Sequence, residues 1–244
     1  MGLSVYYWLR LAEGDPGAAL GRLRQAALDL PVDAVGEVLH LRGEACSWRN
    51  AEEKDPLWWV LLQSRKSVQA GPGRWLDVEP VELHVFQVVL GSGCEPAVFG
   101  LARYPEFLEV AGERVSVPDA GVWTWVGRVK TQYASNVSLD HFLRCHTAVC
   151  RILVEAERQG ILEDVHDEGG FWGTWDLDVL VRELREWNLL LASMAEGLRE
   201  CGMGQGAAIA EHPEYPVLRL LADRELGRRI AGIVRECRRL RKPD

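Results

Sequence analysis

The chain lacks the features that mark several large classes of protein. None of its six cysteines forms a C-x-x-C pair, and four of them lie in or beside apolar segments, which favours reduced, buried thiols over a disulfide framework. The longest apolar runs, such as Leu57 to Leu62, are far too short to cross a bilayer. The first residues show no basic stretch followed by an apolar core, so we expect no signal peptide. These absences predict a soluble, cytoplasmic protein.

An excess of positive charge is also missing. The chain has 28 Lys and Arg against 36 Asp and Glu, a net charge of −8, which argues against non-specific binding to nucleic acid. The one basic stretch follows one side of a predicted C-terminal helix, with Arg224, Arg228, Arg235, Arg239 and Lys242. No aromatic residues interleave these cations, so we expect them to be solvated or paired with acidic neighbours. We expect neither nucleic acid nor a membrane as a partner.

What the chain does contain predicts an α+β fold. Strand-like patterns dominate before Trp125 and helical patterns dominate after Ser138. Such segregation is typical of a mostly antiparallel sheet from the N-terminal half, with the C-terminal helices packed on one face. No low-complexity linker or internal repeat divides the chain. We therefore predict one domain over residues 1–244, with a boundary near residue 136 as the alternative.

Local signals predict where several elements begin and end. Ser4 to Leu11 and Val35 to Cys46 are predicted strands. Asp15-Pro16 and Asp55-Pro56 each combine a capping residue with proline at the first helical position. Ser138 and Asp176 are predicted caps of two later helices. The second of these has the clearest helical period in the chain, carried by Leu177, Leu180, Val181, Leu184, Trp187, Leu191, Met194 and Leu198. Trp187 is a predicted core residue.

The segment from Trp123 to Trp172 is the predicted centre of the fold. Its helix carries His141 and Cys145 four residues apart, on one side, as metal ligands can be. The spacing matches no zinc pattern, and zinc would need further ligands such as His166 or Asp167. We expect Cys145 and His146 to be core residues and predict no metal and no cofactor. A catalytic Cys145 would need His141 or a distant base together with a lowered pKa.

A polar loop before this helix is the predicted ligand site. Its hydrogen-bonding residues are Lys130, Gln132, Tyr133, Ser135 and Asn136, and His141 follows on the helix. Unpaired N–H groups at a helix start favour an anion. The alternative is a capped turn in which Lys130 and Tyr133 pack locally.

Three polar residues after the helix form a second candidate. His166, Asp167 and Glu168 end a predicted strand and are followed by two glycines. Adjacent acids of this kind can bind a metal or transfer protons. The alternative is a solvated turn. Together with Cys145, these three residues are the candidates for catalysis.

Four short segments carry a family resemblance. They are Phe99 to Pro105, Lys130 to Ser135, Phe142 to His146 and Asp167 to Trp172. Over about the middle third of the chain they resemble a family of uncharacterised bacterial proteins with no assigned function. The resemblance implies no particular activity, cofactor or catalytic residue.

Two functional hypotheses remain. The first is a binding or interaction protein whose many tryptophans hold a protein partner or a small anionic ligand. The second is a hydrolase or transferase acting on a small anionic substrate, with Lys130, Gln132, Tyr133 and His141 around the substrate and His166, Asp167 or Glu168 as acid–base groups. No complete catalytic set is visible in the sequence, which favours the first hypothesis.

Overall fold

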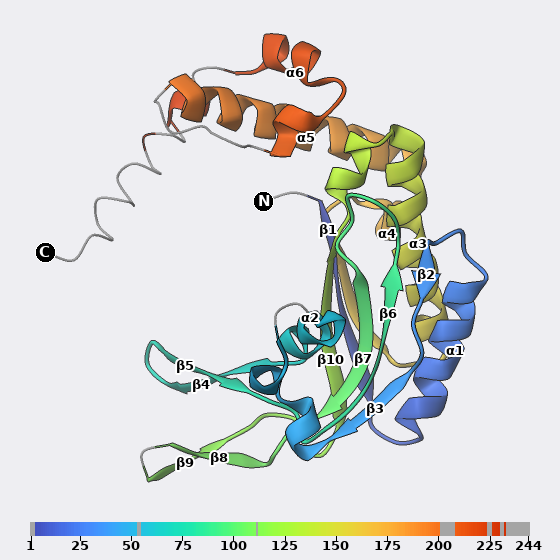
Figure 1. Ribbon diagram of the computed structural model, residues 1–244, viewed down its shortest axis with the longest axis vertical. Helices are drawn as coiled ribbons and strands as arrows, with labels where there is room; N and C mark the ends of the chain where they lie inside the picture. Colours follow the sequence, from blue (N-terminus) through green and yellow to red (C-terminus); the bar gives the residue numbers. More distant parts are fainter. Residues whose placement is uncertain are drawn as a thin grey trace, which may run out of the picture.

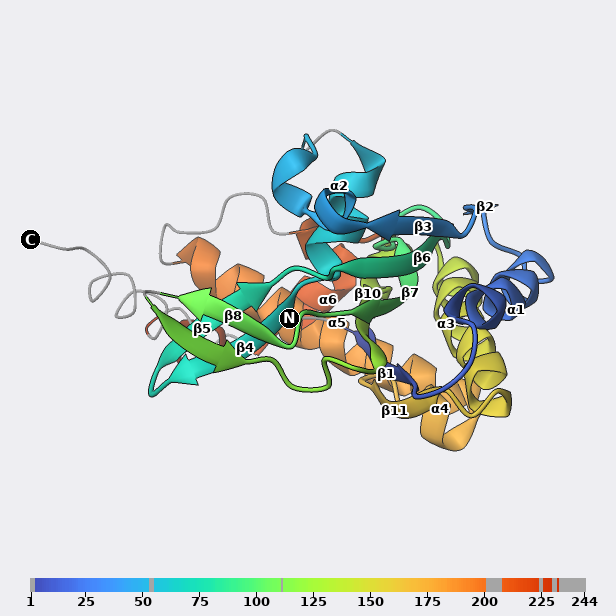
Figure 2. The ribbon, with the colours of Figure 1, turned by 90° about the horizontal axis from the view of Figure 1, so that it is seen from below.

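The structure is a computed structural model that describes residues 3–52, 55–110, 112–200, 208–223, 226–229 and 232. A seven-stranded sheet forms its centre, and two helices lie side by side on one face of this sheet (Figures 1 and 2). Within the described ranges, no helix is both long enough and apolar enough to span a membrane.

The central sheet is antiparallel in the strand pairs that build it. Its order is β11-β1-β10-β7-β6-β2, and β3 pairs with β6 as well. The bounds are β1 Ser4–Leu11, β2 Ala34–Val35, β3 Leu39–Arg42, β6 Glu82–Val89, β7 Ala97–Arg103, β10 Trp123–Lys130 and β11 Leu162–Asp167. The predicted α+β fold with a mostly antiparallel sheet is confirmed, although β11 comes from the helix-rich half.

Strand β1 illustrates how the sequence sets the two faces of the sheet. Val5, Tyr7 and Leu9 are buried, whereas Tyr6 and Trp8 are only half-buried. The reason is that alternate side chains of a strand point to opposite faces. Helices α1 (Pro16–Leu28) and α3 (Leu139–Arg158) contact each other and cover the buried face.

Both of these helices begin where the sequence predicts. Asp15 accepts a hydrogen bond from the backbone N–H of Gly17, and Pro16 opens α1. The hydroxyl of Ser138 accepts one from the N–H of His141 at the start of α3. Each cap satisfies an N–H group that has no partner within its helix.

Smaller elements surround the other face and one end of the sheet. A short helix and two hairpins lie on this side (Figure 1). The helix is α2 (Pro56–Gln63), and the hairpins are β4 (Lys66–Gly71) with β5 (Arg74–Val78) and β8 (Phe107–Val110) with β9 (Glu113–Ser116). Two 3-10 turns, η1 (Gly43–Cys46) and η2 (Trp48–Asn50), precede α2. The predicted strand from Val35 to Cys46 is therefore wrong over residues 43–46, which form η1, and residues 36–38 interrupt it between β2 and β3. Gly43 adopts a φ of 56°, which ends β3 and turns the chain into η1.

The second half of the longest helix and the elements after it pack around a second, smaller apolar cluster. Helix α4 (Phe171–Thr174) leads into the long α5 (Leu177–Glu200), and η4 (Ala208–Glu211) and α6 (Tyr215–Leu221) pack on its second half. This half buries small and polar side chains, and the predicted core residue Trp187 is only partly buried. The basic stripe from Arg224 to Lys242 lies largely outside the described residues. Its member Arg228, which is described, pairs with Glu200.

Candidate ligand site

The histidine in the middle of α3 belongs to a buried hydrogen-bond chain. His146 is fully buried; its Nδ1 lies 2.8 Å from the Thr131 hydroxyl and its Nε2 lies 3.0 Å from Asp167 Oδ1. Asp167 also accepts hydrogen bonds from the backbone N–H groups of Gly169 and Trp172. The order hydroxyl–imidazole–carboxylate matches that of a nucleophilic triad. Thr131 is 0% exposed, so a substrate cannot reach its hydroxyl. This hydrogen-bond chain instead links the end of β10 to α3 and β11 in the core.

The three candidates for acid–base chemistry at the end of β11 lie in three different environments. His166 is exposed and packs against Tyr6, with ring centroids 5.9 Å apart. Asp167 faces the core, and Glu168 accepts a hydrogen bond from the N–H of Ser4 at 2.9 Å. His166 and Asp167 point to opposite faces because side chains alternate along a strand. Glu168 instead binds the backbone at the start of β1. The structure does not bring them together as one catalytic group.

The predicted polar loop forms the end of β10 and the 3-10 turn η3 (Gln132–Asn136). The ammonium group of Lys130 lies 4.3 Å from the Tyr133 ring centroid and 3.2 Å from its hydroxyl, so these two pack locally. Gln132 and Ser135 turn inward and are buried. The amide of Asn136 donates to the carbonyl of Ala208. The six predicted ligand residues therefore do not share one pocket, since His141 lies against another loop.

A cavity of about 300 Å³ lies where η3, the start of α3, α5 and the segment before α6 meet. Of the predicted residues it includes Ser135. Its other lining residues are Val137, Ser138, Leu139, Leu184, Arg185, Asn188, His212, Pro213 and Glu214. The lining thus combines apolar side chains with a cation, a carboxylate, an amide and an imidazole.

A hydrogen-bond chain fixes the polar wall of this cavity. The N–H of Leu3 donates to Gln132 Oε1 at 3.0 Å, so Gln132 Nε2 is the atom that donates to Asn188 Oδ1, also at 3.0 Å. The NH₂ group of Asn188 then faces His212 Nε2 at 3.4 Å. The orientations of the Gln132 and Asn188 amide groups both follow from the N–H of Leu3, because a backbone N–H can only donate.

The neutral imidazole of His212 cannot accept hydrogen bonds from both of its neighbouring donors, the N–H of Glu214 and the NH₂ group of Asn188. The N–H of Glu214 donates to His212 Nδ1 at 3.1 Å, so in the neutral ring the proton resides on Nε2. Burial lowers the pKa of His212, against an opposing effect of Glu214, which favours the neutral ring. Two donors, from Asn188 and His212, therefore meet at 3.4 Å with no acceptor between them. An oxygen atom in the cavity would satisfy both.

Charge around the cavity favours a ligand of low negative charge. The guanidinium of Arg185 is exposed at its rim, and Leu139 marks the N-terminus of the 20-residue helix α3, where unpaired N–H groups carry partial positive charge. Glu214 also lines the cavity, and Asp140 lies in the first turn of α3. These two acids oppose a dianion more than a monoanion.

Sequence reasoning missed most of this cavity. Arg185, Asn188 and His212 lie far from η3 along the chain, and no motif connects them. One signal was available: Asn188 is a polar residue on the apolar side of α5. A buried amide needs partners, so it pointed to a polar contact at that position.

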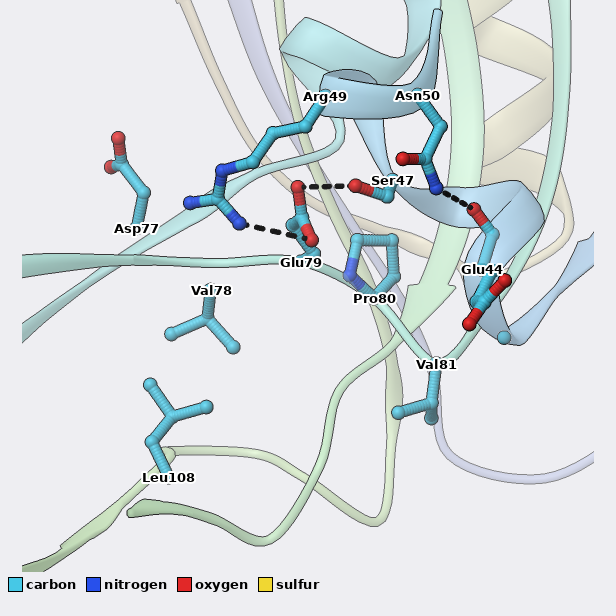
Figure 3. Close-up of a pocket in the computed structure, with 11 residues that line it drawn as sticks. Glu44, Ser47, Arg49, Asn50, Asp77, Val78, Glu79, Pro80, Val81 and Leu108 are labelled. Atoms are coloured by element: carbon cyan, nitrogen blue, oxygen red, sulfur yellow. Dashed lines mark hydrogen bonds and ion pairs between the residues drawn. The ribbon is translucent and has the colours of Figure 1, made fainter. Parts of the chain in front are cut away.

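A larger cavity in the described part of the chain lies elsewhere. It measures about 560 Å³ and is bounded by η1, η2, the end of β5 and Leu108 (Figure 3). Its polar groups bind one another: Glu79 accepts from Ser47 at 2.9 Å and pairs with Arg49 at 3.4 Å. Carboxylates outnumber cations around it, so it does not suit an anion.

Among the residues that the structure describes, two groups of side chains have the composition of metal ligands. The first group consists of His40, Glu82 and His84, and the second consists of His146, Cys150 and Asp167. In each group the ligand atoms lie within 4.8 Å of one another. Glu82 already pairs with Arg42 and Arg103, whose charges oppose a cation. Asp167 is saturated by His146 and two N–H groups.

Fold and site together define an α+β protein with a small, half-apolar cavity at the start of α3. Comparisons with family models, with curated proteins and with solved structures give no match to this chain. The resemblance seen in the sequence therefore stays a prediction.

Proposed function

We propose that this protein binds a small carboxylate through the cavity between η3, α3 and α5. The supporting observation is the pair of buried donors from Asn188 and His212, which meet at 3.4 Å without an acceptor. A buried donor left unsatisfied costs about 1–3 kcal/mol. A carboxylate oxygen between the two would recover that free energy.

The shape and charge of the cavity narrow the ligand class. A volume of about 300 Å³ is at the small end of ligand sites. Val137, Leu139 and Leu184 suit an apolar body, while Arg185 suits a carboxylate head. Glu214 and Asp140 make a phosphate dianion the poorer match. A small aliphatic or aromatic monocarboxylate fits these features best.

A binding role fits the geometry better than catalysis. No nucleophile with an adjacent base lies among the described lining residues of this cavity. The candidates His166, Asp167 and Glu168 are not among those residues either. The proposed role is therefore non-catalytic recognition, as in a sensor or carrier of a small acid.

Calorimetric titration of the full chain with hexanoate and with benzoate tests the proposal. Arg185→Gln removes the exposed cation at the rim and should weaken the binding of either probe about tenfold or more, because hydrogen bonds to charged groups contribute about 1.5–3 kcal/mol.

The matched control is Arg182→Gln, which removes another exposed arginine of α5 that is not part of the cavity lining. Its affinity should equal that of the unchanged protein. Absence of binding for both probes, or equal weakening in the two variants, would contradict the proposal.

A further inference from the structure

A groove lies over strands β1 and β10, on the face of the sheet that α1 and α3 leave uncovered. It consists of two cavities of about 250 and 390 Å³ that share Gln63, Arg65 and Val126. The two strands form its floor, where Trp8 pairs with Val126, and the end of α2 contributes Gln63 to its lining. Val126 is 57% exposed, so a ligand can reach this β1–β10 groove from solvent.

Aromatic rings line the β1–β10 groove. Tyr6 and Trp8 alternate with buried residues along β1, so both point toward the groove. Trp59 of α2 also lines it, and all three residues are partly exposed. The face of an aromatic ring is apolar and carries partial negative charge. It therefore suits a ligand that presents C–H groups on a flat side.

Every charged side chain that lines this groove already has a partner of opposite charge. The pairs are Arg10 with Asp119 and Glu163, Lys66 with Asp119, Arg65 with Asp77, and Arg128 with Glu95, at distances of 2.8 to 3.9 Å. An ionic ligand would have to displace one of these partners, and its gain would be only the difference between two similar contacts. The charges therefore favour an uncharged ligand.

Uncharged polar side chains of the groove lack a hydrogen-bond partner among the described residues. They include the Trp8 indole N–H, the Thr124 hydroxyl and the Gln63 amide. A hydroxyl and an amide can each donate and accept, so a ligand whose groups do both matches them best. Sugar hydroxyl groups have this property. A proline-rich peptide, which also docks in aromatic grooves, has no N–H at its prolines to pair with the Gln63 oxygen.

We propose that the β1–β10 groove binds a neutral oligosaccharide. The C–H side of one sugar ring stacks on Trp8, and its hydroxyl groups exchange hydrogen bonds with Gln63 and Thr124. The groove follows β1 from Tyr6 to Arg10, about 13 Å at about 3.3 Å per residue, which exceeds one sugar ring. Among the described residues it shares none with the proposed carboxylate cavity, so this inference does not depend on that site.

Calorimetric titration of the full chain with three neutral trisaccharides, maltotriose, cellotriose and triacetylchitotriose, provides the test. At least one should bind, and its affinity should change less than about twofold between about 50 and 500 mM NaCl, because the contacts are not ionic. Trp8→Ala removes the stacking ring and should weaken binding about tenfold or more. Gln63→Ala removes the free amide and should weaken it about fivefold.

The matched control is Trp75→Ala, which removes an exposed tryptophan of β5 that does not line the groove and should leave the affinity unchanged. Gln63→Ala, at a partly exposed position, keeps the test decisive if Trp8→Ala fails to fold. Absence of binding for all three trisaccharides, equal weakening in Gln63→Ala and Trp75→Ala, or tighter binding of decaproline than of any trisaccharide would each overturn the proposal.

Discussion

At the scale of single residues, two glycines set how closely aromatic rings approach the sheet. Tyr7 of β1 pairs with Gly127 of β10, and its ring covers that glycine. Trp125 covers Gly100 in the same way. The Tyr7 hydroxyl and the Trp125 N–H both donate to the carbonyl of Val98, at 2.7 and 3.0 Å. These hydrogen bonds hold the two rings in place.

Replacement of Gly127 by alanine should therefore destabilise the protein. The new Cβ would lie 2.2 Å from the Tyr7 ring, which cannot move without losing its hydrogen bond to Val98. We expect a loss of about 1–3 kcal/mol in the free energy of unfolding, measured in urea. Gly121→Ala, at a position with nothing within 4 Å, should change it by less than about 0.5 kcal/mol. Equal effects of the two changes would refute this account.

Asp167 should determine part of the acid sensitivity of the fold. Burial raises its pKa, but the hydrogen bond and charge of His146 and the N–H groups of Trp172 and Gly169 outweigh burial and leave the pKa below the ordinary value of 3.8. A carboxylate whose pKa falls on folding stabilises the protein above the unfolded pKa, and this contribution is lost as the pH falls through the folded pKa.

Asp167→Asn should accordingly flatten the loss of stability below about pH 4 and should cost about 1.5–3 kcal/mol at pH 7. Urea unfolding across the acid range measures both effects. Asp164→Asn, at an exposed position of the same strand, should keep the acid loss of the unchanged protein. A steep acid loss retained in Asp167→Asn would show that other carboxylates dominate.

At the scale of elements, α5 differs from the other long helix. Helix α3 buries a broad apolar side, as its sequence predicts. Helix α5 buries Leu180 and Leu184 in its first half, but Asn188, Ser193 and Glu196 in its second. Polar contacts therefore hold α6 on α5, beside a small apolar cluster that includes Ala192 and Leu218. Contacts of this kind depend on particular partners rather than on buried area.

Glu196 is the main link between α5 and α6. It is 4% exposed, accepts hydrogen bonds from the Tyr215 hydroxyl and Arg199, and pairs with Arg219. Glu196→Gln removes the charge and should weaken this contact by about 1.5–3 kcal/mol. Hydrogen exchange of α6 should then speed up about tenfold or more. Glu200→Gln, one turn further along α5, should leave α6 protected; loss of protection in both variants would contradict this role.

At the scale of the whole molecule, the described elements form an open arc. The sheet with α1 and α3 makes its back, while α5 with α6 extends from one end and the two hairpins extend from the other (Figure 1). The cavity that we propose as a carboxylate site lies where the back meets the α5 end. The start of α3 contributes Ser138 and Leu139 to its lining.

The start of α3 also indicates how far sequence reasoning reached. The cap at Ser138, the shared side of His141 and Cys145, and the prediction of an anion site near Ser135 all follow from local spacing. The distant residues that these side chains contact cannot be predicted from local spacing. Asn188 is 53 positions from Ser135. Only tertiary packing brings α5 and η3 together around one cavity.

The sequence by itself determined the α+β class, the strand from Ser4 to Leu11, the helix starts and the buried side of α3, because strand alternation, helical period and capping act over a few residues. Tertiary structure decided the rest. It split the strand predicted from Val35 to Cys46, made Trp187 a partly buried residue, and separated His166 from Asp167 and Glu168. The physical reason is that burial and hydrogen-bond partners depend on contacts between distant segments, which local patterns do not encode.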